Sequence, residues 1–190
     1  MVTLSKIYTR TGDKGSTRLG NNKPVAKTDP RVECCGATDE LNSVLGLTLT
    51  CDLPSSTAQL LRSIQNDLFD VGADLCLPEE KGDKGLRVSA AQVTRLESAI
   101  DQINETLEPL NSFLLPGGST AASWLHLARA VCRRAELSVW RLREIEFVNE
   151  NVTFYLNRLS DLLFVMARNE NDFGRQDILW DPGRFRNEDK

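Results

Sequence analysis

The sequence predicts an all-α fold, a five-helix up-and-down bundle preceded by an irregular N-terminal loop. From Asp29 onward, apolar residues recur with helical spacing in five successive segments. The spacing alternates between four and three residues, which is typical of helices packed nearly parallel to one another, and the connections are fairly short. With 190 residues, a single compact domain can bury a hydrophobic core without disulfide support.

Capping signals mark where the first three helices begin. Asp29 and Pro30 open the first helix, because Asp29 suits the N-cap and Pro30 the first helical position. The next two helices begin at Ser and Gln residues that form capping boxes, in which each side chain reaches the other residue's backbone N–H. These pairs are Ser56 with Gln59, and Ser89 with Gln92. The apolar positions that follow are Leu60, Ile64, Leu68, Val71 and Leu75, and then Val93, Leu96, Ile100, Ile103 and Leu107.

The last two helices follow a glycine-rich turn and an asparagine. Ser119 caps the fourth helix after Pro116-Gly117-Gly118, and the fifth helix follows Asn151. Their apolar positions are Ala121, Leu125, Ala128, Cys132, Ala135, Val139 and Leu142, and then Val152, Tyr155, Leu159, Leu162 and Met166. Because residues 1–28 and 78–88 escape the helical pattern, we expect an N-terminal loop segment (1–28), a helical bundle domain (29–175) and a C-terminal tail (176–190).

Composition argues against two classes of partner. A formal net charge of -4 and a pI near 5.2 do not suit a general nucleic-acid surface, which needs an excess of Lys and Arg. Any anionic ligand must therefore meet a local basic cluster. No apolar run approaches the roughly 18 residues of a membrane span, and Met1 to Lys6 is too short for a signal peptide. We expect a soluble protein that binds neither nucleic acid nor membrane.

Cysteine and histidine usage restricts the chemistry further. The five cysteines are odd in number, lack CxxC spacing and mostly lie in apolar helical patterns, which indicates reduced core cysteines and a cytoplasmic protein. They are Cys34, Cys35, Cys51, Cys76 and Cys132. His126 is the only histidine, so one chain cannot build a zinc or iron site from several histidines.

The segment from Thr9 to Thr17 combines two glycines, three threonines, a serine and two cations. Glycines let backbone N–H groups converge on an anion, while hydroxyls and cations supply further donors for a phosphate chain. The segment is not a Walker A loop, because its lysine precedes the second glycine. Residues 82–85 repeat the GDKG core without the flanking hydroxyls. A nucleotide-binding loop and a solvated turn therefore both remain open on local grounds.

A polar stripe follows Ser119 on the fourth helix. Its members are spaced three, four and three apart and share one face, with Arg134 beside them. They are His126, Arg129, Arg133 and Glu136. Such a stripe is commonly a solvated or salt-bridged surface. The alternative is a grip on a metal-bound polyphosphate, since arginines suit phosphate oxygens and a nearby Glu can help to hold magnesium.

Two further features have structural and functional interpretations. Asn157 and Asp161 lie one turn apart and interrupt an apolar helix, and Asn157 alone can be explained by a core hydrogen-bond network. The apolar segment Phe113-Leu114-Leu115 precedes the turn at residues 116–118. Local physics favours a core plug that closes one end of the bundle.

These segments, in this order, resemble the PduO-type ATP:cob(I)alamin adenosyltransferase family. Four blocks carry the resemblance over nearly the whole chain: IYTRTGDKGST, KTDPRV with GATDELNSVLG, FLLPGGS with LHLARAVCRRAE, and FYLNRLSDLLFVMAR. The resemblance implies an enzyme that transfers the 5′-deoxyadenosyl group of ATP to the cobalt of reduced cobalamin, with release of triphosphate and with Mg2+ as cofactor. It also implies a homotrimer of five-helix bundles with ATP bound between neighbouring subunits.

The resemblance assigns the nucleotide-binding positions. They are Thr9, Arg10, Thr11, Gly12, Ser16, Thr17, Lys27, Arg133, Arg134, Glu136 and Asn157. Within this set it implies that Arg133 contacts the triphosphate, that Glu136 lies near the Mg2+ and that Asn157 lies at the nucleotide. Leu137 departs from the family pattern, because several relatives carry a further arginine there, and the phosphate grip is expected to be weaker.

The resemblance also assigns the corrinoid side. Asp39 and Arg129 match a pair that joins two subunits close to the corrinoid, and Phe113 matches an aromatic residue beneath the corrin ring. With Arg133, these three residues are expected to act in catalysis. A flavin reductase that supplies the electron and an adenosylcobalamin-dependent enzyme that receives the product are further expected partners.

The chemistry explains why such residues are needed. Cob(I)alamin is itself a strong nucleophile that attacks the 5′-carbon of ATP, so the protein need supply no general base. It must orient that carbon and stabilise the departing charge. The loop from Thr9 to Thr17 suits the first task, while Arg133, Lys27 and magnesium suit the second. Phe113 beneath the ring would displace the lower axial ligand and ease reduction of cobalt.

Two other classes of function compete with this hypothesis. A ferritin-like metal bundle requires Glu-x-x-His pairs on facing helices, and here Ser123 precedes His126 by three, so the motif is absent. A non-catalytic helical scaffold would account for the heptad spacing but leaves the N-terminal loop without a purpose. Measurement of ATP binding separates the scaffold from the enzyme.

Overall fold

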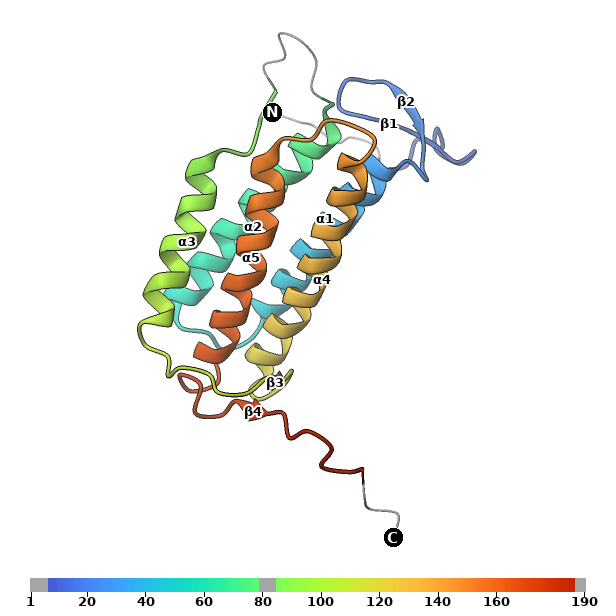
Figure 1. Ribbon diagram of the computed structural model, residues 1–190. Coiled ribbons are helices and arrows are strands. Elements are labelled where there is room, and N and C mark those ends of the chain that lie inside the picture. The colour runs from blue at the N-terminus through green and yellow to red at the C-terminus, as the bar shows by residue number, and fades with distance from the viewer. Residues whose placement is uncertain (1–6, 79–84, 187–190) are drawn as a thin grey trace.

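A computed structural model describes residues 7–78 and 85–186, which form five helices arranged as an up-and-down bundle (Figure 1). The predicted fold class is confirmed. The helices are α1 (Pro30–Thr48), α2 (Ser55–Cys76), α3 (Ala90–Asn104), α4 (Thr120–Arg143) and α5 (Glu150–Asn169). Helix α4 packs against both α1 and α5, while α2 packs on α1 and α3 packs on α5.

The bundle closes around one apolar core. The predicted seam positions of α4 and α5 are buried, including Leu125, Val139, Tyr155 and Leu159. Cys34 and Cys132 belong to this core, while Cys35, Cys51 and Cys76 are partly buried, and all five are free thiols. None of the helices in the described part of the chain combines the length and apolar character needed to cross a membrane.

Three of the predicted helix starts are confirmed. The Asp29 carboxylate accepts from the backbone N of Arg31 at 2.9 Å. Ser89 and Gln92 form the predicted capping box of α3. Ser119 caps α4, because its hydroxyl oxygen accepts from the backbone N of Ala122 at 3.0 Å.

The other two helix starts differ from the prediction. Helix α2 begins at Ser55 with Pro54 at its N-cap, so Ser56 lies inside the first turn and makes no capping box with Gln59. Helix α5 begins at Glu150 rather than after Asn151, because Asn149 takes the N-cap position. The Asn149 amide also donates to the Asp74 carboxylate at 2.8 Å, which fixes it as the cap.

Helix α3 is shorter than the apolar spacing indicates. It ends at Asn104, and Leu107 is buried from the turn that follows. Most of the predicted 78–88 connection, including nearly all of the second GDKG copy, lies outside the described residues.

Two short antiparallel strand pairs, which the sequence did not predict, lie at opposite ends of the bundle (Figure 1). Strands β1 (Ser16–Arg18) and β2 (Pro24–Ala26) form a hairpin before α1. Strand β3 (Leu114–Leu115) pairs with β4 (Ile178–Leu179), which joins the segment before α4 to the expected tail. Each strand pair therefore shapes one end of the molecule.

Candidate functional site

The β1–β2 hairpin encloses a cavity of about 520 Å³. Its lining includes five of the residues expected to bind ATP. The lining residues are Thr11, Gly12, Ser16, Thr17, Arg18, Pro24 and Lys27. The hydroxyls and cations of the N-terminal segment therefore converge on one space, as a phosphate site requires and as a solvated turn does not.

Gly12 allows this convergence. A Cβ at this position would lie 3.1 Å from Lys27 Cε and 3.2 Å from the Ser16 carbonyl oxygen, which is closer than side chains normally tolerate. The backbone N of Gly15 donates to the Gly12 carbonyl at 3.1 Å, and the backbone N of Lys27 donates to the Gly15 carbonyl at 2.8 Å. These contacts fix the backbone of Lys27, and its side chain lies beside Gly12.

Thr9 and Arg10 precede the cavity and do not line it. The Thr9 and Thr11 hydroxyl oxygens lie 2.9 Å apart, within hydrogen-bond distance. Arg10 adopts a left-handed backbone conformation with φ of 59°, and its guanidinium lies 5.5 Å from the centre of the Tyr8 ring. Both residues are exposed, and they directly precede Thr11, the first residue that lines the hairpin cavity.

The polar stripe of α4 divides into a buried part and an exposed part. His126 is 6% exposed and packs edge-on against Phe164, with ring centres 6.2 Å apart. Burial, followed by the charge of Arg129, lowers the pKa of His126, so its imidazole is neutral at pH 7. The Arg129 guanidinium lies 5.4 Å from the centre of the same Phe164 ring. The stripe is therefore not a uniformly solvated surface.

The two neighbouring arginines differ in their partners. Arg134 forms an ion pair with Glu40 of α1, and both side chains are more than half exposed. Arg133 is exposed and makes no hydrogen bond or ion pair with residues 7–78 or 85–186. Arg133 can therefore bind an external anion without breaking an existing contact.

A polar chain connects α4, α5 and α3. The Asn157 amide donates to Glu136 Oε1 at 3.2 Å, and Arg158 Nη1 donates to Asn157 Oδ1 at 2.6 Å. Arg158 Nε also donates to Glu97 Oε1 at 3.0 Å. No local pattern marks Arg158 as a partner of Asn157, because adjacent residues on a helix do not face each other. Asp161, one turn further, is exposed and takes no part.

Glu136 keeps one carboxylate oxygen available. Among the described residues, only its Oε1 accepts a hydrogen bond. The same residues contain no cluster of three or more His, Cys, Asp or Glu side chains that would hold a metal on their own. The donor set fits a magnesium ion that arrives with a polyphosphate, because Mg2+ is commonly bound by one or two carboxylates together with phosphates and waters.

Phe113 is 78% exposed, so its interpretation as a core plug is wrong for this chain. Pairing of β3 with β4 holds the neighbouring backbone and leaves the ring outside the bundle. The backbone N of Trp180 donates to the Phe113 carbonyl at 2.8 Å, and the two rings meet edge-on with centres 6.0 Å apart. Together they line a cavity of about 410 Å³. Trp180 was missed, since no local pattern reveals a pairing between such distant segments.

Asp39 and Arg129 form no ion pair within the described chain. Asp39 is exposed on α1; the Ser43 hydroxyl donates to its carbonyl oxygen at 2.9 Å, and its carboxylate accepts no hydrogen bond from the described residues. Arg129 is half-buried beside Phe164. The structure thus leaves the Asp39 carboxylate free to meet a group from outside the chain.

The expected nucleotide residues form two separate groups in the single chain. The hairpin cavity contains none of the expected residues on α4 and α5, namely Arg133, Arg134, Glu136 and Asn157. In Figure 1 the hairpin lies at the end of the bundle where α1 begins, whereas β3 lies at the opposite end, and Phe113 directly precedes β3 in the chain. Within the single chain, the hairpin residues and the α4 and α5 residues therefore do not line one cavity.

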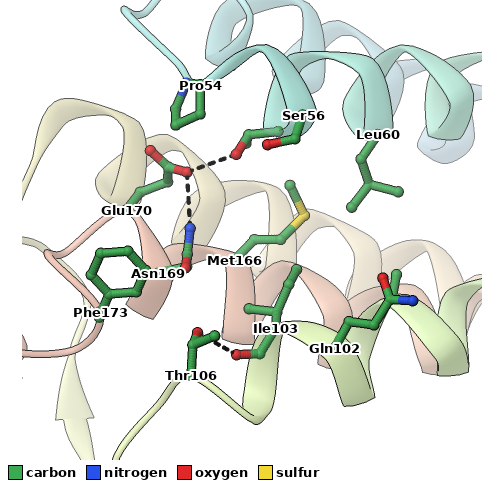
Figure 2. Close-up of a pocket in the computed structure, with 12 residues that line it drawn as sticks. Pro54, Ser56, Leu60, Gln102, Ile103, Thr106, Met166, Asn169, Glu170 and Phe173 are labelled. Carbon is green, nitrogen blue, oxygen red and sulfur yellow. Dashed lines mark hydrogen bonds between the residues drawn. The ribbon is translucent and has the colours of Figure 1, made fainter.

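A further cavity of about 500 Å³ lies between α2, α3 and α5 (Figure 2). Its walls are mostly apolar, with Leu60, Ile103, Met166 and Phe173 among them. The Thr57 hydroxyl donates to Glu170 Oε1 at 3.0 Å at one edge. No Lys or Arg lines this cavity, so it does not suit a triphosphate.

Cys35 and Cys132 do not suit nucleophilic chemistry. Burial raises the pKa of the Cys132 thiol, and burial raises the pKa of Cys35 to about 12. Because the thiolate is the reactive form, both thiols are inert near neutral pH.

Comparison with known proteins gives a consistent result. The sequence model of the cobalamin adenosyltransferase family matches residues 7–170. A corrinoid adenosyltransferase of Mycobacterium tuberculosis strain H37Rv is 46% identical over 187 residues, which are 96% of each chain. The corrinoid adenosyltransferase PduO of Salmonella typhimurium is 42% identical over 171 residues, 90% of this chain and 51% of that protein.

A solved structure is similar over most of the fold. It is a variant of the PduO-type ATP:corrinoid adenosyltransferase from Lactobacillus reuteri in complex with cobalamin and ATP, and it superimposes with a TM-score of 0.84 at 38% identity. The match covers 92% of this chain and 99% of that one.

Proposed function

The chain belongs to the cobalamin adenosyltransferase family and transfers the 5′-deoxyadenosyl group of ATP to the cobalt of reduced cobalamin, with release of triphosphate; we propose how its residues divide this reaction. The β1–β2 hairpin together with the α4 and α5 side chains serves the nucleotide. Phe113 serves the cobalt. The hairpin cavity carries the first assignment, because it gathers Thr11, Ser16 and Lys27 around one space.

The nucleotide part orients ATP and stabilises the departing charge. Hydroxyls of the hairpin and the Lys27 ammonium would bind the phosphates, with Thr9 and Arg10 closing over them. Arg133 is the strongest candidate for the transition state, since it is exposed and unpaired within the described chain, and its guanidinium can donate two parallel hydrogen bonds to phosphate oxygens. Arg134 would contribute positive charge while it remains paired with Glu40.

Glu136 and Asn157 would act at the metal and the nucleotide. A magnesium ion carried by ATP supplies charge neutralisation on the triphosphate when bound, and the unengaged Oε2 of Glu136 would hold it. Asn157 is already oriented by Arg158, so its amide nitrogen faces Glu136. The chain would thereby fix its carboxylate before ATP arrives.

At the corrinoid, the reaction needs a side chain that can displace the lower axial ligand of cobalt. Phe113 is exposed and held by the β3–β4 pairing and by Trp180, which leaves its ring available to a large planar molecule. Placed beneath the corrin ring, it would displace the lower axial ligand and favour reduction of cobalt. Reduced cobalamin then attacks the 5′-carbon without a general base from the protein.

A homotrimer would complete the site. In the single chain the hairpin cavity lacks the α4 and α5 residues, and the Asp39 carboxylate has no partner within the described residues. Helix α4 also exposes 44% of Leu127, 51% of Leu137 and 46% of Trp140. Contact between subunits would cover these side chains, join Asp39 to the Arg129 of a neighbour and bring one chain's hairpin to another chain's Arg133.

Cellular context follows from the same chemistry. Five free thiols support a reducing compartment, and we assign the protein to the cytoplasm. A flavin reductase would supply the electron that produces cob(I)alamin, and an adenosylcobalamin-dependent enzyme would take the product.

The direct test is an anaerobic assay with ATP, magnesium and chemically reduced cobalamin, in which absorbance follows formation of the cobalt–carbon bond. The wild-type protein should form adenosylcobalamin and release triphosphate stoichiometrically. Omission of magnesium should slow the reaction. A folded protein that forms no cobalt–carbon bond would contradict the function.

A further inference from the structure

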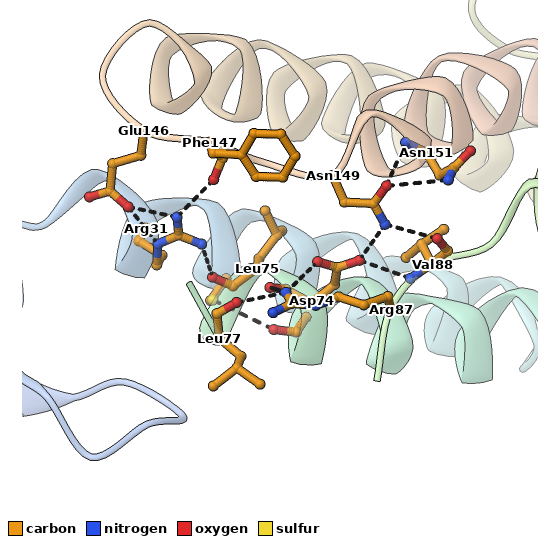
Figure 3. A network of polar contacts seen from close by, with 12 residues as sticks. Arg31, Asp74, Leu75, Leu77, Arg87, Val88, Glu146, Phe147, Asn149 and Asn151 are labelled. Atoms are coloured by element: carbon orange, nitrogen blue, oxygen red, sulfur yellow. Dashed lines mark hydrogen bonds and ion pairs between the residues drawn. The ribbon is translucent and has the colours of Figure 1, made fainter. Parts of the chain in front are cut away.

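Arg31 lies at the centre of a polar cluster outside the residues assigned to either substrate (Figure 3). It occupies the first turn of α1, directly after the hairpin. Its side chain is only 2% exposed, although arginine is almost never fully buried unless it is paired. Such burial calls for partners that use the whole guanidinium.

The guanidinium joins three parts of the chain. Its Nη1 donates to the carbonyl oxygen of Leu75, in the last turn of α2, at 2.7 Å. Its Nε and Nη2 donate to Glu146 Oε2 at 3.1 and 2.6 Å, and Nη2 also reaches the Phe147 carbonyl oxygen at 3.3 Å. Glu146 and Phe147 belong to the connection between α4 and α5 (Figure 3). The start of α1 is thereby tied to both neighbours.

The hairpin rests on this cluster at two points. The backbone N of Gly20 donates to the carbonyl oxygen of Cys76 at 2.9 Å, and Cys76 directly follows Leu75. At the other end of the hairpin, the backbone N of Asp29 donates to the Ala26 carbonyl at 3.0 Å, while the Asp29 carboxylate caps α1 at the backbone N of Arg31. The Arg31 side chain thus holds the residue next to the first attachment point, and its backbone N–H lies at the second.

We infer that Arg31 is a positioning residue for the nucleotide hairpin. It fixes the position of the end of α2 relative to the start of α1. It also connects both to the loop between α4 and α5, the helices that carry Arg133 and Asn157. This inference rests on the proposed function of the hairpin. A lysine cannot replace it, because one ammonium cannot span acceptors on two separate segments as a planar fork does. Placement matters, since a displacement of about 1 Å can cost a factor of about 100 in rate.

The test compares Arg31→Gln and Arg31→Lys with the wild-type protein in the anaerobic assay, with the KM for ATP and the KM for cob(I)alamin measured separately. Both variants should raise the KM for ATP at least tenfold and leave the KM for cob(I)alamin within twofold. Hydrogen–deuterium exchange gives a readout that does not depend on activity. Residues 16–26 of the free variants should exchange at least tenfold faster than in the wild type.

The matched control is Arg168→Lys at the opposite end of the bundle. Arg168 is also buried, and it donates to Asp177 Oδ2 and to the Glu108 carbonyl oxygen, each at 2.8 Å. This variant should lower Tm without changing the KM for ATP or exchange in the hairpin. An equal rise in the KM for ATP would show that any loss of stability has this effect, and would overturn the inference.

If the Arg31 variants do not fold, a milder variant of its partner Glu146 can be measured instead. Glu146→Gln keeps a carbonyl oxygen for the guanidinium but removes the charge, and it should shift the KM for ATP and hairpin exchange in the same direction by a smaller factor. Wild-type values for both quantities in the Arg31 and Glu146 variants would refute the role of Arg31. A wild-type protein without adenosylation activity would instead refute the proposed function.

Discussion

The two ends of the bundle form their proposed sites in different ways. At the hairpin end, the cavity is lined by residues from one short stretch of chain, residues 11–27. At the other end, Phe113 depends on Trp180 and on the pairing of β3 with β4, which comes from a distant segment. A phosphate chain needs many donors, which one loop can supply. A ring that displaces a ligand must stay exposed and rigid, which requires support from elsewhere.

Both ends nevertheless share one feature, a buried arginine whose hydrogen bonds hold neighbouring segments of the chain together. Arg31 binds Glu146 and two carbonyl oxygens beside the hairpin. Arg168 binds Asp177 and one carbonyl oxygen beside β4. Variants that alter one end and leave the other unchanged therefore test whether the hairpin end acts on ATP and the Phe113 end acts on the corrinoid.

The largest effect is expected at the proposed contact between subunits. If the Asp39–Arg129 pair is desolvated in a trimer, removal of one partner leaves an uncompensated charge and costs about 3 to 5 kcal/mol of association. Reversal of both charges should recover more than either single reversal. Sedimentation velocity measures the outcome, and a wild-type monomer at micromolar concentration would contradict it.

Arg133→Ala should nearly abolish turnover and leave the fold intact. The side chain is exposed and unpaired within the described chain, so the free energy of unfolding should not change, whereas loss of a contact made mainly in the transition state costs about 2 to 4 kcal/mol. Steady-state kinetics and thermal denaturation check both statements. A wild-type rate at saturating ATP would remove Arg133 from the mechanism.

Phe113→Ala should affect only the cobalt end. Because the ring is exposed, Tm and ATP affinity should be unchanged, while adenosylation of cobalamin should slow at least tenfold, a loss of about 1.4 kcal/mol. Cobinamide is the control, since it lacks the nucleotide base that serves as lower ligand, and the variant should lose less activity with it. Equal losses on both corrinoids would count against ligand displacement.

The same comparison shows what the sequence could predict. The residues from Thr9 to Thr17 are contiguous, so Gly12 and Ser16 could be recognised as part of a candidate phosphate site before their cavity was seen, whereas Lys27 was expected there only from the family resemblance. The five helices followed from apolar spacing, because that spacing directly reflects burial of one helix face. The helix ends were less predictable. Asn149 and Asn151 both suit the N-cap of α5, and the Asn149 amide is held by distant groups, the Asp74 carboxylate and the Val88 carbonyl oxygen.

Non-local contacts account for most of what was missed. The exposure of Phe113 depends on a strand that forms only when residues 178–179 return to residues 114–115. Arg31 has no local signature, since its role arises from Leu75 and Glu146 in separate parts of the chain. His126 was grouped with polar residues by spacing alone, whereas packing against Phe164 buries it.

The smallest expected effect concerns pH and the Phe113 end. The pKa of His126 is lowered in the folded protein, first by burial and then by Arg129, while Asp177 opposes the shift. The unfolded state, with a pKa of about 6.5, then takes up the proton more readily, so this contribution to stability is complete above about pH 6.5 and is lost as pH falls towards the folded pKa. In the wild type, Tm should therefore fall as the pH is lowered below about 6.5. In His126→Gln this fall in Tm should be smaller. An unchanged decline would contradict the assignment.

The most direct test of the division between the two ends is the spectrum of enzyme-bound cob(II)alamin at saturating ATP in the wild type, in Phe113→Ala and in Lys27→Ala. We expect a four-coordinate fraction in the wild type and in Lys27→Ala, because the lower ligand is displaced at the Phe113 end. Phe113→Ala should show a much smaller fraction with unchanged ATP affinity. If Phe113→Ala retains the wild-type fraction, or if Lys27→Ala loses it at full ATP occupancy, the two ends do not perform separate tasks.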